Sequence, residues 1–324
     1  MPPTEFRWLS RKQYAQYRDI VPLTNTSTID WCMAESLPSA EPILVPAAAV
    51  YASLLGRDGN FFLPELTTTG VACHSTVEGA TWLAMCEVIE REALAIAWHA
   101  GGVFAPVNPC GTAAEELTSG SRAGNSVQMV LFRVPTGAPF PVLLAVAWGQ
   151  SSFPWAATGV ACRRSAVDAA IKAACEAAQM RALLEHGTRH PPRSVRTFAD
   201  HGFYYAAPDG ARELWRRLNT DKGPVWLEDI ESAGAGPPDV LLTKAVQYFT
   251  GRGLTLARYV YPPLTREPLP YVVRIVAPQV MDVNADERFP RLGLSSLYTT
   301  PVRLGWCDRS PTEDDISLSV VPLA

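Results

Sequence analysis

The sequence carries little charge for its length. Asp, Glu, Lys and Arg make up 19% of its 324 residues, against about 25% in an average globular domain. The 28 basic and 32 acidic residues give a formal net charge of −4, without a basic block. This balance argues against nucleic acid as the main partner, because nucleic acids are bound by clustered basic side chains. With 48% hydrophobic residues, the chain can bury a substantial core and does not have the composition of a disordered segment.

Long unbroken apolar runs are absent as well. The longest uncharged stretch, residues 134–162, contains Pro135, Pro139, Pro141 and Pro154. Prolines at this density are incompatible with a membrane helix but suit a buried strand between turns. The N-terminus has no apolar segment of the kind found in secretory signals. We therefore expect neither a membrane span nor a secretory signal.

Cysteine pairs with metal or redox spacing are also missing. The seven cysteines are an odd number, and no two have the C-x-x-C spacing. Cys86 and Cys175 lie within apolar helical patterns, where we expect buried free thiols. This usage favours a reducing compartment, so we expect the protein to be cytoplasmic.

The sequence contains none of the stronger catalytic motifs. It has no G-x-S-x-G, no G-x-x-x-x-G-K-[S/T] and no H-E-x-x-H, and its five histidines lack the spacing of metal ligands. The run SGSRAGNS at residues 119–126 has the composition of a phosphate-binding loop, but no helix start follows it. We interpret it as a flexible loop. No catalytic residue is assigned on this basis.

The hydrophobic pattern predicts two long helices, at residues 77–98 and 166–186. Shorter elements alternate after them: helices are expected at 210–218 and 239–250, and strands at 128–134, 141–148, 225–228, 254–260 and 270–277. Strands that alternate with helices indicate an α/β or α+β fold with mixed sheets packed against long helices. We expect residues 1–66 to be an irregular segment packed on the core, and 67–324 to form the main domain.

The first long helix carries two acids on one face. Glu87 and Glu90 lie about 60° apart around the helix axis, so their carboxylates repel unless a cation joins them. A divalent metal is one interpretation. The alternative is a solvated charged stripe that also includes Arg91 and Glu92. Ser75 and Glu78 have the spacing of a capping box at the helix start.

The second long helix repeats this arrangement. Ser165 and Asp168 have the spacing of a capping box, and Glu176 and Gln179 then share a face among alanines. Polar groups in such surroundings either pair with each other or hold a ligand. Lys172, four residues before Glu176, offers a plain ion pair as the alternative.

Together these segments resemble the ATP-binding core of the YcaO family. That family's azoline-forming members carry S-N-G-x-A-x-G-N-x-x-x-E-A, then E-x-x-E-R-D-A, and about ninety residues later E-x-x-Q-x-R. The corresponding stretches here are 68–93 (TTGVACHSTVEGATWLAMCEVIEREA) and 176–181 (EAAQMR). Residues 29–47 and 271–280 also resemble flanking family segments. The resemblance thus extends in register over nearly the whole chain.

The resemblance implies a YcaO-like fold and an ATP- and Mg²⁺-dependent activation of peptide backbone amides. The amide oxygen is phosphorylated, and a Cys, Ser or Thr side chain of a ribosomal precursor peptide, or an external sulfur donor, displaces the phosphate. Carried over by position, Glu87, Glu90 and Glu176 would hold metal. Arg91, Gln179 and Arg181 would contact phosphates.

The sequence also departs from the family pattern. The family's two asparagines fall at Thr69 and Ser75, and a further helix carboxylate falls at Gly79. The family's first motif, a G-K-G turn followed by its own E-x-x-E-R helix, and its proline-rich end do not occur in this sequence. We therefore expect a YcaO-like protein truncated at its N-terminus, which needs a second chain to bind ATP. It should also expose an apolar surface, through which it associates with itself or a partner.

Three interpretations follow. The chain is one subunit of a split amide-modifying enzyme, which we favour. Alternatively, it is a catalytically inactive YcaO-like scaffold or a binder of the precursor peptide, as the departures at Thr69, Ser75 and Gly79 suggest. In the third, it is an unrelated α/β protein whose motifs match by chance. The sequence leaves the peptide and the product, azoline or thioamide, open.

Overall fold

A computed structural model describes residues 1–51, 67–119, 127–150, 153–187, 192–234, 236–263 and 270–323. Most of the 119–126 run, interpreted above as a loop, lies outside these ranges, as does the expected domain boundary near residue 66. None of the helices in the described ranges combines the length and apolar character needed to cross a membrane.

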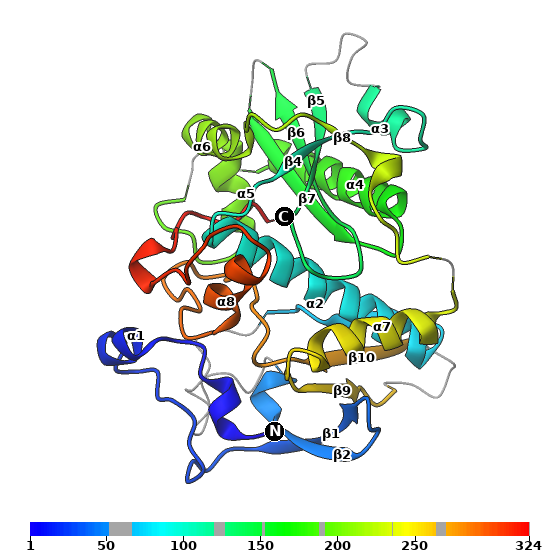
Figure 1. The fold of residues 1–324 in the computed structure, drawn as a ribbon. Coiled ribbons are helices and arrows are strands. Elements are labelled where there is room, and N and C mark those ends of the chain that lie inside the picture. Colours follow the sequence, from blue (N-terminus) through cyan, green and yellow to red (C-terminus); the bar gives the residue numbers. More distant parts are fainter. Residues whose placement is uncertain are drawn as a thin grey trace.

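Two five-stranded sheets lie on either side of a long central helix (Figure 1). The lower sheet in that view is antiparallel throughout. Its strand order is β2 (Pro42–Pro46), β1 (Trp31–Leu37), β9 (Leu256–Val260), β10 (Tyr271–Val276) and β3 (Val71–His74). The upper sheet has the order β7 (Ala156–Cys162), β6 (Val142–Gly149), β5 (Val127–Arg133), β4 (Ala105–Asn108) and β8 (Val225–Trp226). Only its β4–β8 pair is parallel among these strands.

The central helix α2 (Val77–His99) contacts both sheets, as its position between β10 and β7 in Figure 1 shows. It is apolar on nearly all sides and correspondingly buried. The helix begins one residue later than the predicted capping box implies. The cap is Thr76, whose hydroxyl accepts a hydrogen bond from Gly79 N at 3.1 Å. The predicted Ser75–Glu78 capping box is therefore wrong, and Glu78 is exposed.

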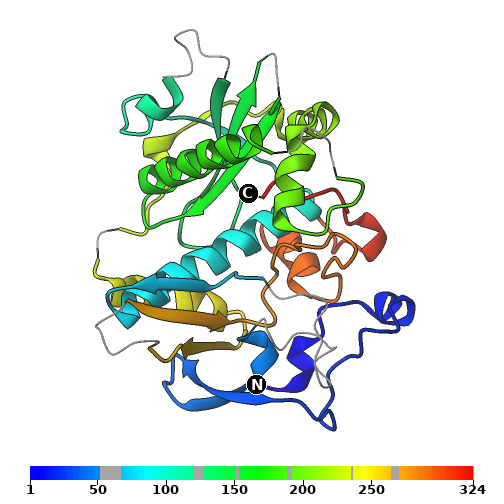
Figure 2. The ribbon, with the colours of Figure 1, turned by 180° about the vertical axis from the view of Figure 1, so that it is seen from behind.

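Helix α4 (Ala166–Glu185) covers the outer face of the upper sheet, which Figure 2 shows from behind. Ser165 caps its start, because its Oγ accepts a hydrogen bond from Asp168 N at 3.1 Å. The Asp168 carboxylate pairs with Arg164 at 3.7 Å, so only the Ser165 half of the predicted capping box is present. The alanine face of α4 packs directly on β7, so that the backbones of the helix and the strand lie close together. A Cβ at Gly159 of β7 would stand 2.3 Å from Ala173 O and 2.4 Å from Ala177 N. Glycine at position 159 is thus required for the close approach of α4.

The mixed α/β fold predicted from the sequence is confirmed, with two long helices and every predicted strand present near its expected position. The remaining helices are α1 (Arg11–Gln16), α3 (Glu115–Ser119), α5 (Phe198–Ala206), α6 (Pro208–Leu218), α7 (Pro238–Thr250) and α8 (Ser296–Arg303). Residues 31–46, expected to be irregular, instead form the β1–β2 hairpin. Cys86 is buried as predicted, whereas Cys175 is exposed because α4 turns it away from β7.

Candidate functional site

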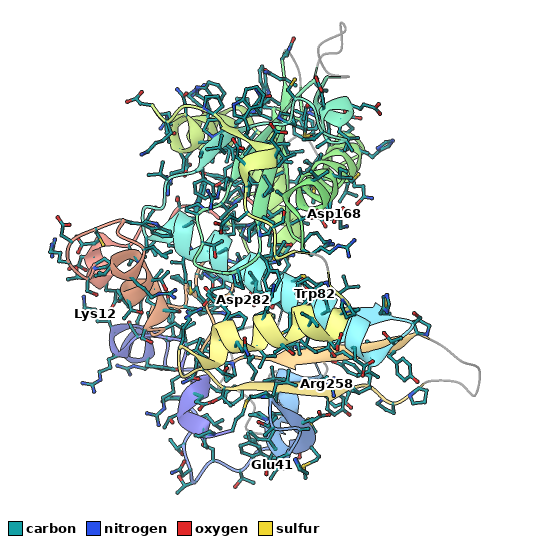
Figure 3. All side chains as sticks on the ribbon, turned by 45° about the vertical axis from the view of Figure 1, so that its right-hand side comes forward. Lys12, Glu41, Trp82, Asp168, Arg258 and Asp282 are labelled. Atoms are coloured by element: carbon teal, nitrogen blue, oxygen red, sulfur yellow. The ribbon has the colours of Figure 1, made fainter. Side chains whose placement is uncertain are left out.

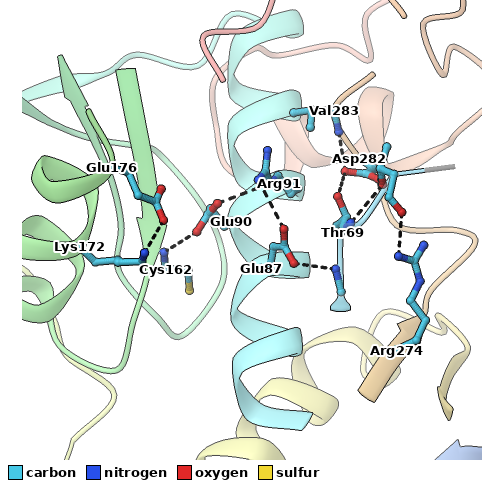
Figure 4. A network of polar contacts seen from close by, with 12 residues as sticks. Thr69, Glu87, Glu90, Arg91, Cys162, Lys172, Glu176, Arg274, Asp282 and Val283 are labelled. Carbon is cyan, nitrogen blue, oxygen red and sulfur yellow. Dashed lines mark hydrogen bonds and ion pairs between the residues drawn. The ribbon is translucent and has the colours of Figure 1, made fainter. Parts of the chain in front are cut away.

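The helices α2 and α4 place three glutamates around one pocket of about 190 Å³. Its lining residues are Ala72, Leu83, Glu87, Glu90, Arg91, Arg163 and Glu176. The three carboxylates expected to hold metal are therefore brought together, although Glu176 is more than eighty residues from the others in the sequence. Figure 4 shows them in a row, with Arg91 between Glu87 and Glu90. The alternative of a solvated charged stripe on α2 is wrong, because Glu90 is only 6% exposed.

Glu87 faces the loop that precedes β3. Its Oε2 accepts a hydrogen bond from Gly70 N at 3.0 Å, and its Oε1 lies 3.4 Å from Arg91 Nη2. Burial raises the pKa of Glu87, although Arg91 and the Gly70 N–H both act to lower it. The carboxylate is thus held in place by a backbone donor while its charge is only partly compensated.

Glu90 is the most perturbed carboxylate of the pocket. Its Oε2 accepts a hydrogen bond from Cys162 N at 3.1 Å, and its Oε1 lies 3.5 Å from Arg91 Nε. Burial, opposed by Arg91 but reinforced by the negative charges of Glu176 and Glu87, raises the pKa of Glu90 to about 8. At neutral pH this group is therefore mostly protonated in the protein alone. A cation in the pocket would favour release of that proton.

Glu176 reaches the pocket from α4 but is already paired there. Lys172 Nζ lies 2.9 Å from its Oε1, so the ion pair considered as the plain alternative is present. The other two predicted ligands of α4 do not line the pocket. Gln179 is exposed, and Arg181 donates to Pro154 O at 2.8 Å and pairs with Glu185 at 3.1 Å. Their assignment to phosphates stays a prediction.

Position 79, where the resemblance places a further carboxylate, is filled by a neighbour. A Cβ at Gly79 would lie 2.1 Å from Nδ1 of His74, so the imidazole ring occupies the space of any side chain at 79. An acid at position 79 and a histidine at position 74 in this orientation exclude each other. This chain therefore contributes no carboxylate from that turn of α2.

A buried polar network next to Glu87 escaped the sequence reasoning. Asp282, near the middle of the molecule in Figure 3, accepts hydrogen bonds from Thr67 Oγ1 at 2.7 Å and Thr69 Oγ1 at 2.9 Å. Arg274 donates from Nη1 to Thr67 O at 2.8 Å. Thr69 thus anchors the segment whose Gly70 N–H holds Glu87. The available signal was a single acid, Asp282, six residues after the end of β10 at Val276.

The donor chemistry of the pocket fits Mg²⁺, which prefers carboxylate oxygens. Glu90 supports this fit, since burial, with the charges of Glu176 and Glu87, raises its pKa by more than Arg91 lowers it, and a bound cation would offset that effect. The site is nevertheless not a complete metal cage within this chain. Across the described ranges, no group of three His, Cys, Asp or Glu side chains is placed to hold a metal ion. Arg91 and Lys172 provide the positive charge instead.

Comparisons with known proteins identify the family of this chain. The family model described as YcaO cyclodehydratase, ATP- and Mg²⁺-binding, matches residues 1–281. An uncharacterized protein of Methanothermobacter thermautotrophicus is 27% identical over 286 residues, which is 84% of this chain and 70% of that protein.

Solved structures share the fold. A heterocyclase in complex with substrate and cofactor superposes with a TM-score of 0.82 at 18% identity, and the heterocyclase TruD with 0.79 at 15%. Each match covers 100% of this chain but only 44% and 45% of those chains, so this chain spans less than half their length. YcaO from Methanopyrus kandleri, bound with AMPPCP and Mg²⁺, gives 0.62 at 23% identity, over 79% of this chain and 65% of that one. The chain belongs to the YcaO family.

Proposed function

We propose that this protein is a component of an ATP- and Mg²⁺-dependent enzyme that modifies backbone amides of a ribosomally made precursor peptide. The observation that carries the proposal is the convergence of Glu87, Glu90 and Glu176 with Arg91 in one pocket, with Glu90 held at a raised pKa. The family's description as an ATP- and Mg²⁺-binding cyclodehydratase supports it. The favoured product is an azoline, and a thioamide is the variant in which an external sulfur donor attacks.

In this proposal the amide oxygen takes the terminal phosphoryl group of ATP, and a Cys, Ser or Thr side chain of the peptide then displaces it as phosphate. Mg²⁺, when bound, would supply the positive charge that neutralises the phosphates. Glu87, Glu90 and Glu176 would hold the metal, and Glu90 would lose its proton on binding. Arg91 and Arg163, which line the same pocket, are placed to contact phosphate oxygens. Gln179 and Arg181 would need to turn toward the pocket to join them.

We further propose that a second chain completes the site. The pocket's three carboxylates face the positive charges of Arg91, Arg163 and Lys172, which leaves little net negative charge to hold metal ions beside a triphosphate. Additional acidic ligands are therefore needed, and a partner protein or another copy of the chain would supply them. Such assemblies exist among the structural relatives, where a microcin synthetase McbBCD complex has a TM-score of 0.59 at 18% identity.

The second candidate is an inactive scaffold or precursor-peptide binder. The Lys172–Glu176 pair and the ring of His74 against Gly79 favour it, because both occupy places that a metal-binding group would need.

Calorimetric titration with AMPPCP and Mg²⁺ separates the candidates. The chain is titrated alone and then with any co-encoded partner protein, and Glu90→Gln is compared with Glu78→Gln, an exposed acid of the same helix. Saturable binding that needs the partner and is lost only in Glu90→Gln supports the split enzyme. If AMPPCP with Mg²⁺ binds in none of the mixtures, the split enzyme is refuted and the inactive scaffold or peptide binder is supported.

A further inference from the structure

His74 ends β3 and turns its ring toward the start of α2. Ala72 and His74 are two residues apart on the strand and so share the face that contains the carboxylate pocket, which Ala72 lines. The ring lies against Gly79, where a Cβ would be 2.1 Å from Nδ1. The glycine thus allows an imidazole to lie on the helix surface.

The orientation of this ring is fixed by the backbone. Thr76 N donates a hydrogen bond to Nδ1 of His74 at 3.3 Å, so Nδ1 is the acceptor and the neutral ring carries its proton on Nε2. Nε2 has no hydrogen-bond partner within the described residues, and the side chain is exposed. An oriented N–H donor is therefore available at the surface.

The donor lies over Gly79, at the start of the helix stripe that leads to the pocket. Gly79, Leu83, Glu87 and Glu90 lie along one stripe of α2, with about 12 Å of helix between Gly79 and Glu87. Half-exposed Leu83 lines the pocket and bridges the two ends. Tyr271, the cross-strand neighbour of His74, is 48% exposed.

We propose that His74 Nε2 donates a hydrogen bond to a backbone carbonyl of the peptide substrate, whose side chains contact Leu83 and Tyr271. The carboxylates lie two turns of helix further on, where the amide is activated. An apolar and aromatic surface suits a peptide rather than a phosphate, which would call for basic neighbours. This assignment rests on the proposed function for the choice of a peptide as the occupant. It makes His74 a positioning residue for that peptide.

The test uses the full chain with its partner, on an array of twelve-residue peptides that contain Cys, Ser or Thr, in the absence of ATP. We expect His74→Ala to weaken the array binding at least tenfold and His74→Gln, which keeps an N–H donor, to restore part of it. His186→Ala is the control, because His186 is an exposed histidine at the end of α4. The affinity of all three variants for AMPPCP with Mg²⁺ should stay within twofold of the wild-type value.

Equal peptide binding by wild type and His74→Ala would overturn the assignment, as would a parallel loss of AMPPCP affinity or a wild type that binds no peptide on the array. The proposed function fails separately. If His74-dependent peptide binding is present but no peptide is modified when ATP and Mg²⁺ are added, the assignment stands and the protein is a peptide binder.

Discussion

Two glutamates of α2, at positions 90 and 92, are both buried but have different surroundings. Glu92, 2% exposed, accepts hydrogen bonds from both terminal nitrogens of Arg252, at 2.9 and 2.8 Å, and from Tyr248 Oη at 3.2 Å. Glu90 accepts one backbone N–H and lies 3.5 Å from a guanidinium nitrogen. They point to opposite sides of the helix, Glu92 toward α7 and Glu90 toward α4.

The comparison separates an acid that is fully bonded within the protein from one that retains capacity for a ligand. A buried carboxylate that is fully bonded joins two helices and has no capacity left for a ligand. A buried carboxylate with few partners retains lone pairs and a raised pKa, both of which a metal ion would use. Position on the helix and burial do not distinguish Glu90 from Glu92. The number of hydrogen bonds that each carboxylate accepts does, three for Glu92 and one for Glu90.

The largest expected effect is on activity at position 90. Glu90→Gln should abolish amide modification by the complex, a loss of more than about a hundredfold, because a neutral amide oxygen is a weaker ligand for Mg²⁺ than a carboxylate and supplies no negative charge. The free energy of unfolding should stay unchanged, since the glutamine is nearly isosteric with the protonated acid. Turnover with peptide and urea unfolding measure the two quantities. Full turnover by the variant would refute the assignment of Glu90 to metal.

The opposite outcome is expected at position 92. Glu92→Gln leaves Arg252, whose side chain is 15% exposed, without its counter-charge, so the free energy of unfolding should fall by about 3 kcal/mol. Nucleotide affinity, measured well below the unfolding transition, should be unaffected. A stable variant that fails to bind AMPPCP would show that Glu92 belongs to the site.

The pH dependence of binding sharpens the comparison further. Glu90 must lose its proton to hold a metal, and its pKa is about 8. Below that value the affinity for Mg²⁺ with AMPPCP should therefore fall about tenfold for each pH unit. Calorimetry of the complex between pH 6.5 and 8.5 tests this, and Glu78→Gln should keep the same slope. A flat profile in the wild type would mean that Glu90 is not a ligand.

The smallest effect concerns the third hydrogen bond of Glu92. Tyr248→Phe removes one donor and leaves the Arg252 pair in place, so the free energy of unfolding should fall by about 1 kcal/mol. Urea unfolding compares this variant with Glu92→Gln. If the tyrosine variant loses as much as the glutamine variant, the ion pair does not dominate the stability of this contact.

The sequence was informative where the signal is local. Helical periodicity was sufficient to place α2 and α4 and to identify Glu87 and Glu90 as neighbours. The start of α2 at Val77 was predicted, but its capping residue was wrong, because Ser75 and Thr76 are both good N-cap residues and the sequence does not distinguish them. Gln179 was expected to join Glu176 at the ligand site. The face of α4 that packs on β7 is that of Ala173 and Ala177, and Gln179 is exposed.

The long-range pairings could not be read from local patterns. The β1–β2 hairpin contains several prolines, which argue against a strand, yet β2 lies at the edge of the sheet, where a missing N–H donor is tolerated. Strand β1 pairs with β9, more than two hundred residues later. The hydrogen bond between Thr69 and Asp282 is also a long-range contact. It depends on the pairing of β3, which follows Thr69, with β10, which precedes Asp282.

The glycine at position 159 allows the close approach of α4, which carries Glu176, to β7, without itself lining the carboxylate pocket. A single methyl group there would meet the backbone of α4 and stand 2.7 Å from Glu176 Cβ. The spacing between the acids of the two helices is therefore a property of small, uncharged residues. In the proposed metal site, substitutions among glycine and alanine at this contact would change the spacing of the glutamates while every charged side chain is kept.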